Sequence, residues 1–97
     1  MQTYIFLLNI TDQGIKGIKD FEKRVAASKA AFKKAGGNWI SYYLTLGAYD
    51  GVIVAEFPTP QAALSVMLSV SKLGNIRTTT LTAFPDKEVA KIIKKIS

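Results

Sequence analysis

The stretch LGAYDGVIVAEF (residues 46–57) decides how the rest of this chain folds. Its first half is rich in glycine and holds Tyr49 and Asp50, as a tight turn would. Its second half is a β-branched apolar run that contains one carboxylate, Glu56. Glycine and aspartate favour turns, whereas valine and isoleucine favour strands. The stretch therefore predicts a turn that leads directly into a strand.

Three further segments have the composition of strands. The runs at residues 3–10, 38–46 and 76–84 are rich in β-branched and aromatic side chains, which favour extended backbone. The run at 38–46 ends where the glycine-rich turn begins, so it predicts a β-hairpin with residues 52–57.

Helices are predicted between these strands because apolar residues recur there at intervals of three and four. The first is expected from residue 13 or 15 to 35, after an N-cap at Thr11. The second is expected over about 60–73, with Thr59 as its N-cap and a proline at its first position. A third is expected to begin at 85–86. Glycines after the first two helices supply the left-handed residue that commonly ends a helix.

The predicted order is βαββαβ plus a C-terminal helix, which is the ferredoxin-like α+β arrangement in a single domain of residues 1–97. In this arrangement helices cover one face of an antiparallel sheet. The strands are apolar on both faces, and an open apolar face would exceed what monomers usually expose. We therefore expect a homodimer or higher oligomer in which two sheets pack face to face. The apolar second helix is a candidate for further assembly.

Composition narrows the possible chemistry. The chain has no cysteine and no histidine, and its 7 acidic residues are spread along the sequence. Thiolate and imidazole chemistry are thereby excluded, and we expect no metal site and no cofactor. The N-terminus lacks the basic region of a signal peptide, and no apolar run is long enough to span a bilayer. These features predict a soluble cytoplasmic protein with no membrane partner.

The net charge of +6 raises the question of nucleic acid. Most of the 13 basic residues fall in two predicted amphipathic helices, where lysines belong on the solvent-facing side. Residues 5–10 fit the short first-strand motif of RNA-recognition domains, which share the same element order. The segment that should carry their second motif, residues 50–57, lacks the internal stacking aromatic and has Glu56 instead. We therefore predict no nucleic-acid partner.

Two charged residues on predicted strands are candidates for chemistry. Glu56 shares a strand face with Val52 and Val54. If that face is covered, its carboxyl group would suit proton transfer; otherwise it reaches solvent or pairs with a basic residue. Arg77 is the only arginine in a predicted strand, and it could clamp a carboxylate or phosphate. Alternatively, it forms a salt bridge to Asp50 or Glu56.

Turn and aromatic residues complete the candidate site. Tyr49 and Asp50 could bind or polarise a ligand oxygen, or they simply shape the turn, since aspartate before glycine caps backbone amides. Strict alternation along the second strand would put Trp39 and Tyr43 on one face, as the apolar wall of a pocket, and Tyr42 on the other. These aromatic residues could equally belong to the core or to an interface.

Three separated stretches of the chain resemble the GYD-domain family. They are LNITDQG at residues 8–14, TLGAYD at 45–50 and GNIRTTTL at 74–81, and the GAYD of the second matches the family's Gly-x-Tyr-Asp motif. The resemblance implies the dimeric α+β barrel group, which includes cofactor-independent monooxygenases, small isomerases and ligand-sensing domains of transcription regulators. It implies a two-sheet dimer but no particular activity. The histidine that several enzymes of the group use is absent here.

Together these features predict a homo-oligomeric small-molecule-binding protein with a pocket between sheet and helices. Tyr49, Asp50, Glu56 and Arg77 are its expected polar groups. One alternative is a cofactor-independent monooxygenase or isomerase acting on a small aromatic or enolisable anion, with Glu56 or Asp50 as base and Arg77 as anion clamp. Another is a stand-alone ligand-sensing or assembly module with a site at a subunit interface.

Overall fold

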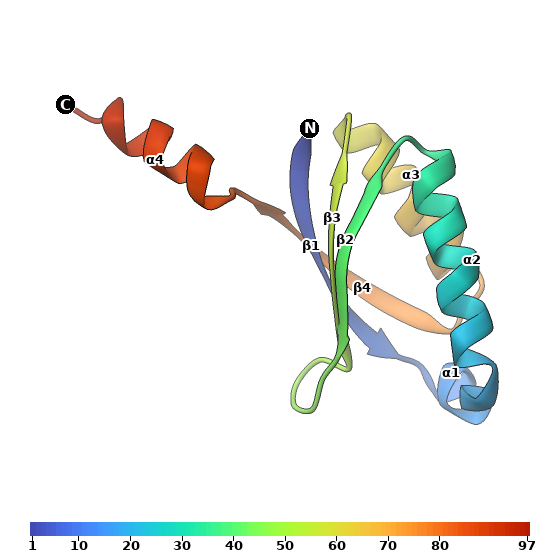
Figure 1. Cartoon of the computed structure of the whole chain (residues 1–97). Helices are drawn as coiled ribbons and strands as arrows, with labels where there is room; N and C mark the ends of the chain where they lie inside the picture. The colour runs from blue at the N-terminus through green and yellow to red at the C-terminus, as the bar shows by residue number, and fades with distance from the viewer.

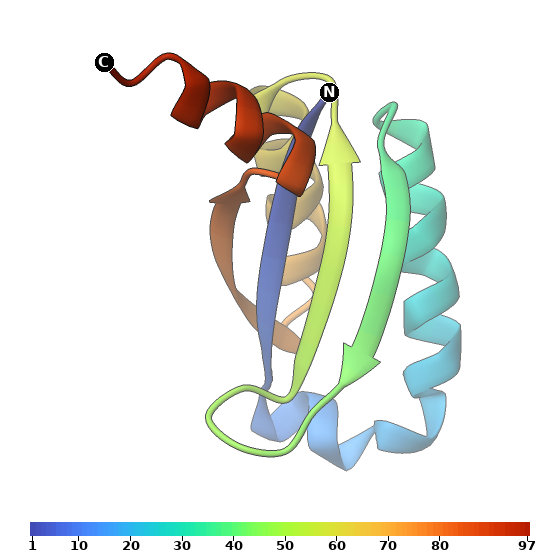
Figure 2. The same ribbon diagram turned by 60° about the vertical axis from the view of Figure 1, so that its left-hand side comes forward.

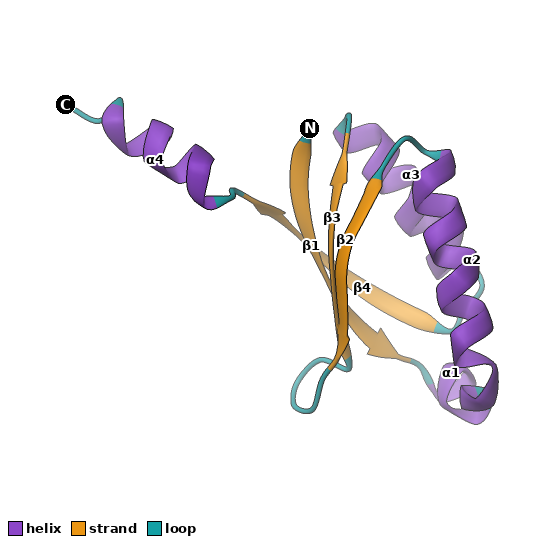
Figure 3. Cartoon of the chain, viewed as in Figure 1, coloured by secondary structure: helices purple, strands orange, loops and turns teal.

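Strand β3 (Gly51–Phe57), which follows the glycine-rich turn, lies inside a four-stranded antiparallel sheet. The computed structural model describes residues 1–97. Its strand order is β2-β3-β1-β4, with β1 (Gln2–Ile10), β2 (Asn38–Leu44) and β4 (Ile76–Ala83). Figure 3 shows the four strands as one twisted layer. The predicted hairpin of β2 and β3 is confirmed by their antiparallel pairing.

Helices α2 (Phe21–Lys34) and α3 (Pro60–Ser71) lie on the same side of the sheet, and no helix covers the opposite side (Figure 1). The element order and the one-sided helices confirm the predicted ferredoxin-like α+β fold. The C-terminal helix α4 (Asp86–Lys94) follows β4 and projects away from the sheet, on the side opposite α2 and α3 (Figures 1 and 2). None of the helices has the length and apolar character needed to cross a membrane.

The single helix predicted from residue 13 or 15 to 35 is wrong. The chain forms α1 (Asp12–Lys16), a 3-10 helix η1 (Ile18–Asp20) and only then α2. Gly17 stands between the first two pieces with φ −100° and ψ 27°, outside the α-helical range. The low helix propensity of glycine therefore breaks the helix here instead of merely fraying its end.

The predicted helix boundaries that rest on capping are confirmed. The hydroxyl groups of Thr11 and Thr59 accept the backbone N–H three residues ahead, both at 3.1 Å, at the starts of α1 and α3. Gly36 and Gly74, which follow α2 and α3, have φ of 82° and 84°. Glycine adopts this left-handed conformation without the strain that a Cβ would add.

Strand β2 departs from strict alternation at one point. Its register with β3 shifts between Trp39 and Ser41, and the resulting β-bulge puts both Trp39 and Tyr42 opposite buried residues of β3. Trp39 and Tyr42 therefore share the helix-covered face, whereas Tyr43 lies on the other side of the strand. The prediction that Trp39 and Tyr43 lie on one face is wrong, because alternation alone does not reveal a bulge.

The core lies between the sheet and helices α2 and α3, and aromatic rings dominate it. Phe6, Phe32 and Phe57 are fully buried. Their ring centroids lie 5.2, 5.8 and 6.1 Å apart in tilted and edge-on arrangements, which are the arrangements that aromatic pairs favour. Helix α3 buries its inner side against this cluster through Ala63 and Met67.

Besides the outer side of α3, where Leu64 and Leu68 are exposed, two apolar surfaces have no partner within the chain. We call the uncovered side of the sheet the open face; its apolar residues, which are partly buried or exposed, are Ile5, Leu7, Val52, Val54 and Leu81. The second surface is a stripe on α4 and the residues after it, which consists of the exposed side chains Val89, Ile92, Ile93 and Ile96. Exposed apolar surface of this extent usually marks an interaction site.

Candidate functional site

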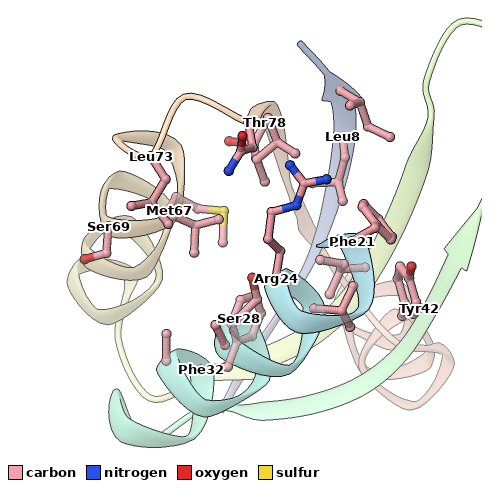
Figure 4. Close-up of a pocket in the computed structure, with 18 of the residues that line it drawn as sticks. Leu8, Phe21, Arg24, Ser28, Phe32, Tyr42, Met67, Ser69, Leu73 and Thr78 are labelled. Atoms are coloured by element: carbon pink, nitrogen blue, oxygen red, sulfur yellow. The ribbon is translucent and has the colours of Figure 1, made fainter. Parts of the chain in front are cut away.

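A cavity of about 180 Å³ lies between the sheet and the two covering helices. Of the 19 residues that line it, 14 are hydrophobic, and they come from α2, α3 and all four strands. The larger ones include Leu8, Phe21, Phe32 and Met67, which Figure 4 labels, together with Trp39 and Val70. An apolar cavity of about 150 Å³ in another protein binds benzene. The space here therefore suits a ligand with a benzene-sized body and a few further atoms.

Arg24 is the only charged residue in the lining of this cavity. In Figure 4 its side chain extends from α2 into the space between Met67 and Phe21. Its Nη2 donates to the carbonyl oxygens of Gly14 and Gly17, both at 3.1 Å, where the C-terminal end of α1 carries partial negative charge. Its Nε is buried and has no acceptor in the protein.

Two aromatic residues of β2 reach the cavity because of the bulge. The Trp39 ring packs edge-on against that of Phe32, with centroids 4.9 Å apart, and the ammonium group of Lys29 lies 5.5 Å from the Trp39 centroid. Burial raises the pKa of the Tyr42 phenol, and the carboxylate of Glu22 raises it further. The phenol is thus protonated at neutral pH and can donate a hydrogen bond.

The charged pair predicted from the sequence lies on the open face, at opposite ends of it. Glu56 is opposite Thr3 and Arg77 is opposite Asn9, on the two sides of β1. Thr3 and Asn9 are six positions apart on β1, which corresponds to about 20 Å along the strand. Glu56 instead accepts a hydrogen bond from the side-chain amide of Asn38 at 3.2 Å. The structure brings Glu56 and Arg77 together neither in one site nor in a salt bridge.

The polar groups of the turn hold the hairpin against the end of β1. The Asp50 carboxylate accepts the backbone N–H of Ile10 at 2.8 Å, and the Asp50 N–H donates to the carbonyl of Leu8 at 2.7 Å. The Thr45 hydroxyl donates to the carbonyl of Tyr49 at 2.6 Å. Tyr49 and Asp50 were expected either to bind a ligand or to shape the turn. These hydrogen bonds correspond to turn shaping, and neither residue lines the cavity.

Among the predicted site residues, only Trp39 lines the cavity. Tyr43 is 62% exposed and pairs with Val52 across the open face. No group of three or more acidic side chains gathers in a way that could hold a metal ion. The arrangement as a whole can hold an apolar body beside the guanidinium group of Arg24.

A model of the GYD domain matches residues 4–93 of this chain. The match includes strands β2 to β4, all of β1 except its first two residues, both covering helices and every residue of the cavity lining. The chain belongs to the GYD-domain family. The resemblance noted in the sequence is thereby confirmed over nearly the whole length of the chain.

The GYD-domain chain is also similar to proteins with names or solved structures. A protein of Thermus thermophilus, named "Glutamine synthetase and cystathionine beta-lyase binding protein", is 30% identical to it over 97 residues and 99% of each chain. The leucine response regulatory protein LrpA of Mycobacterium tuberculosis superposes with a TM-score of 0.59 at 13% identity, over 87% of this chain and 51% of that one. FFRP-DM1 superposes with a TM-score of 0.56 at 21% identity, over 87% of this chain and 100% of that one. The two structural likenesses show a shared fold.

Sequence reasoning missed Arg24, the one charged residue of the cavity. The basic residues of the first predicted helix were assigned to its solvent-facing side as a group. A signal was nevertheless present, because Arg24 follows Phe21 by three positions and precedes Ser28 by four. That spacing puts all three on one side of a helix, and all three line the cavity of this GYD-domain chain.

Proposed function

We propose that this GYD-domain chain is a cytoplasmic small-molecule-binding protein whose ligand occupies the cavity between the sheet and helices α2 and α3. One observation supports this proposal above the others. Protein interiors are close-packed, and a void in a core costs stability. This small domain nevertheless keeps a mostly apolar, partly open space of about 180 Å³ beside Phe32 and Trp39. A ligand in that space would replace the missing contacts.

Binding fits the geometry better than base-catalysed oxygenation or isomerisation. A general base must lie within hydrogen-bond reach of the proton that it removes. The cavity lining contains no aspartate or glutamate. Glu56 lies on the open face, and the Asp50 carboxylate is engaged by the backbone of Ile10. The monooxygenase or isomerase alternative would therefore need a base from outside this cavity.

The test uses Trp39, the only tryptophan of the chain, which lines the cavity. Benzyl alcohol, chosen as a benzene-sized probe, is titrated while tryptophan emission is followed. Ser28→Leu adds apolar volume inside the cavity, and Ala30→Leu adds it at an exposed position on the same helix. We expect saturable binding that Ser28→Leu weakens at least about tenfold and Ala30→Leu leaves unchanged. Equal binding by both variants would contradict the cavity as the site.

We further propose that the chain forms a homodimer through its open face. The open face spreads apolar side chains over β1, β3 and β4, whereas most basic residues lie on α2 and α4. Monomers rarely expose so much contiguous apolar surface. A second sheet packed against the open face would cover it without burying the basic residues of α2, which lie on the covered side.

Sedimentation at micromolar concentration tests the dimer, with twice the chain mass of 10.6 kDa as the expected result. Leu81→Lys puts a charge on the open face, next to Ile5 of the central strand β1, while Leu46→Lys makes the same change at a fully exposed turn position. We expect Leu81→Lys to yield monomers and Leu46→Lys to keep the wild-type mass. A monomeric wild type would contradict this proposal.

Assembly with an enzyme is a second candidate function. The name of the Thermus relative describes binding to glutamine synthetase and cystathionine beta-lyase, and the outer side of α3 exposes Leu64 and Leu68 as an apolar contact surface. If the cavity ligand regulates this assembly, the chain is a ligand-sensing module. Co-elution with purified glutamine synthetase, with and without benzyl alcohol, tests it. We expect Leu68→Lys to abolish co-elution with glutamine synthetase while the dimer persists. Co-elution of this variant would contradict the proposal that the outer side of α3 contacts the enzyme.

A further inference from the structure

The guanidinium group of Arg24 is only partly satisfied by the protein. Its Nη2 serves two carbonyl oxygens, those of Gly14 and Gly17. Its Nε–H is buried without an acceptor. A buried donor without a partner is unfavourable, and more so when the group is charged. The two carbonyl contacts also fix the guanidinium plane, so the Nε–H and the two N–H groups of Nη1 point in defined directions.

The surroundings of Arg24 contain no negative charge that could neutralise it from within the cavity. Every other lining residue is neutral, and most are apolar. Phe21 lies against the guanidinium at 5.6 Å from its ring centroid, which contributes a cation–π contact but no hydrogen-bond acceptor. The other polar side chains of the lining, which include Ser28 and Thr78, carry no charge.

We propose that the ligand of this cavity is a small carboxylate with an apolar body, of about the size of benzoate, and that the guanidinium group of Arg24 donates to its carboxylate oxygens. This inference rests on the proposed small-molecule-binding function and specifies its ligand class. The apolar body fills the space beside Trp39 and Met67, for which a benzene-sized group is suitable. The carboxylate supplies both the missing acceptor and the missing counter-charge, and guanidinium–carboxylate hydrogen bonds are among the strong ones.

Three probes of nearly equal size separate ligand class from cavity occupancy. Benzoate, benzyl alcohol and benzylamine are titrated separately against the full chain at pH 7, with Trp39 emission as the readout. We expect benzoate to bind roughly tenfold or more tightly than benzyl alcohol, as a charge-assisted hydrogen bond to a buried donor allows. We expect benzylamine to bind most weakly, because its ammonium group would face Arg24.

Substitution of Arg24 then tests which group causes the preference. Arg24→Gln removes the charge and the Nε–H, and we expect it to bring the benzoate-to-benzyl-alcohol affinity ratio close to one while benzyl alcohol still binds. Arg24→Lys keeps the charge without the fixed guanidinium, and we expect a ratio at least several-fold below wild type. Lys29→Gln removes an equal charge near the outer side of Trp39, and we expect it to keep the wild-type ratio. Far-UV circular dichroism verifies the fold of each variant, and Arg24→Lys carries the test if Arg24→Gln does not fold.

The possible failures are distinguishable. If benzyl alcohol binds as tightly as benzoate to the wild type, the ligand class is wrong and the cavity proposal stands. If the preference for benzoate persists in both Arg24 variants, Arg24 is not the recognising group and this inference is overturned. If none of the three probes binds and Ser28→Leu changes nothing, both the ligand class and the proposed function fail.

Discussion

The helix-covered face of the sheet and its open face differ in what their side chains contact. On the covered face Phe6 and Phe57 are fully buried against α2 and α3. On the open face Val54 and Leu81 contact only neighbouring strands, and they keep part of their surface in solvent. The covered face therefore provides most of the stability of a single chain, whereas the open face can contribute only when something else covers it.

The same difference separates two kinds of polar group. Arg24 on the covered side is partly buried among mostly apolar walls, where a hydrogen bond or a charge has a larger effect than at an exposed position. Arg77 on the open face is exposed, so its interactions compete with water and are screened by salt. A charged residue in a small domain is thus a better candidate for ligand recognition when it lines an enclosed space.

The largest effect is expected from substitution of a covered-face ring. Phe57→Ala should lower the free energy of unfolding by about 3–5 kcal/mol, because it leaves a void in a close-packed aromatic cluster. Tyr43→Ala, on the open side of β2, should cost no more than about 0.5 kcal/mol. Urea unfolding of both variants at one protein concentration measures the difference. Comparable losses would mean that the open face is as well packed as the core.

A smaller effect is expected at the turn, where Asp50 joins the hairpin to β1. Asp50→Ala leaves the N–H of Ile10 without its acceptor, so we expect a loss of about 1–2 kcal/mol in unfolding free energy. Affinity for benzoate should not change, because Asp50 is outside the cavity. Arg77→Ala should leave both quantities unchanged. A variant of Asp50 that folds with wild-type stability but loses benzoate would instead give Asp50 a role in binding.

The smallest effect concerns the pH dependence of stability. Burial, and then Glu22, raise the pKa of Tyr42 above its usual value of 10.0. The folded chain therefore holds the phenol proton more tightly than the unfolded chain. The stabilisation of the folded state by this proton is fully present below about pH 10 and is lost as the pH rises through the folded-state pKa. Unfolding free energies measured from pH 9 to 11 should decline less steeply in Tyr42→Phe than in the wild type. Identical slopes would show that the pKa of the Tyr42 phenol is the same in the folded and unfolded states.

The order of strands and helices could be predicted from the sequence because its signals are local. Apolar periodicity, the threonine caps and the glycines after α2 and α3 each depend on a few neighbouring residues, and all of them point to one fold. The break at Gly17 has a local signal in the glycine, but glycine propensity alone does not distinguish a broken helix from a frayed one. The bulge after Trp39 could not be predicted locally, because it depends on how β2 pairs with β3.

The predicted site residues depended even more on distant pairing. Whether Glu56 and Arg77 meet is decided by the register of β3 and β4 on β1, which places them at opposite ends of the open face. Whether Arg24 faces solvent or an enclosed space depends on how α2 lies against the sheet. Residue type and spacing indicated candidate groups, but the geometry of the whole sheet determined which of them share a cavity.

Amide chemical-shift mapping with benzoate tests the central claim most directly, because it reports on both faces at once. A ¹H–¹⁵N spectrum of the labelled chain is recorded during the titration. The largest changes are expected at cavity residues such as Arg24, Trp39 and Thr78, with small ones at Tyr43, Val54 and Leu81 of the open side. Changes confined to the open side would contradict a ligand site on the helix-covered face.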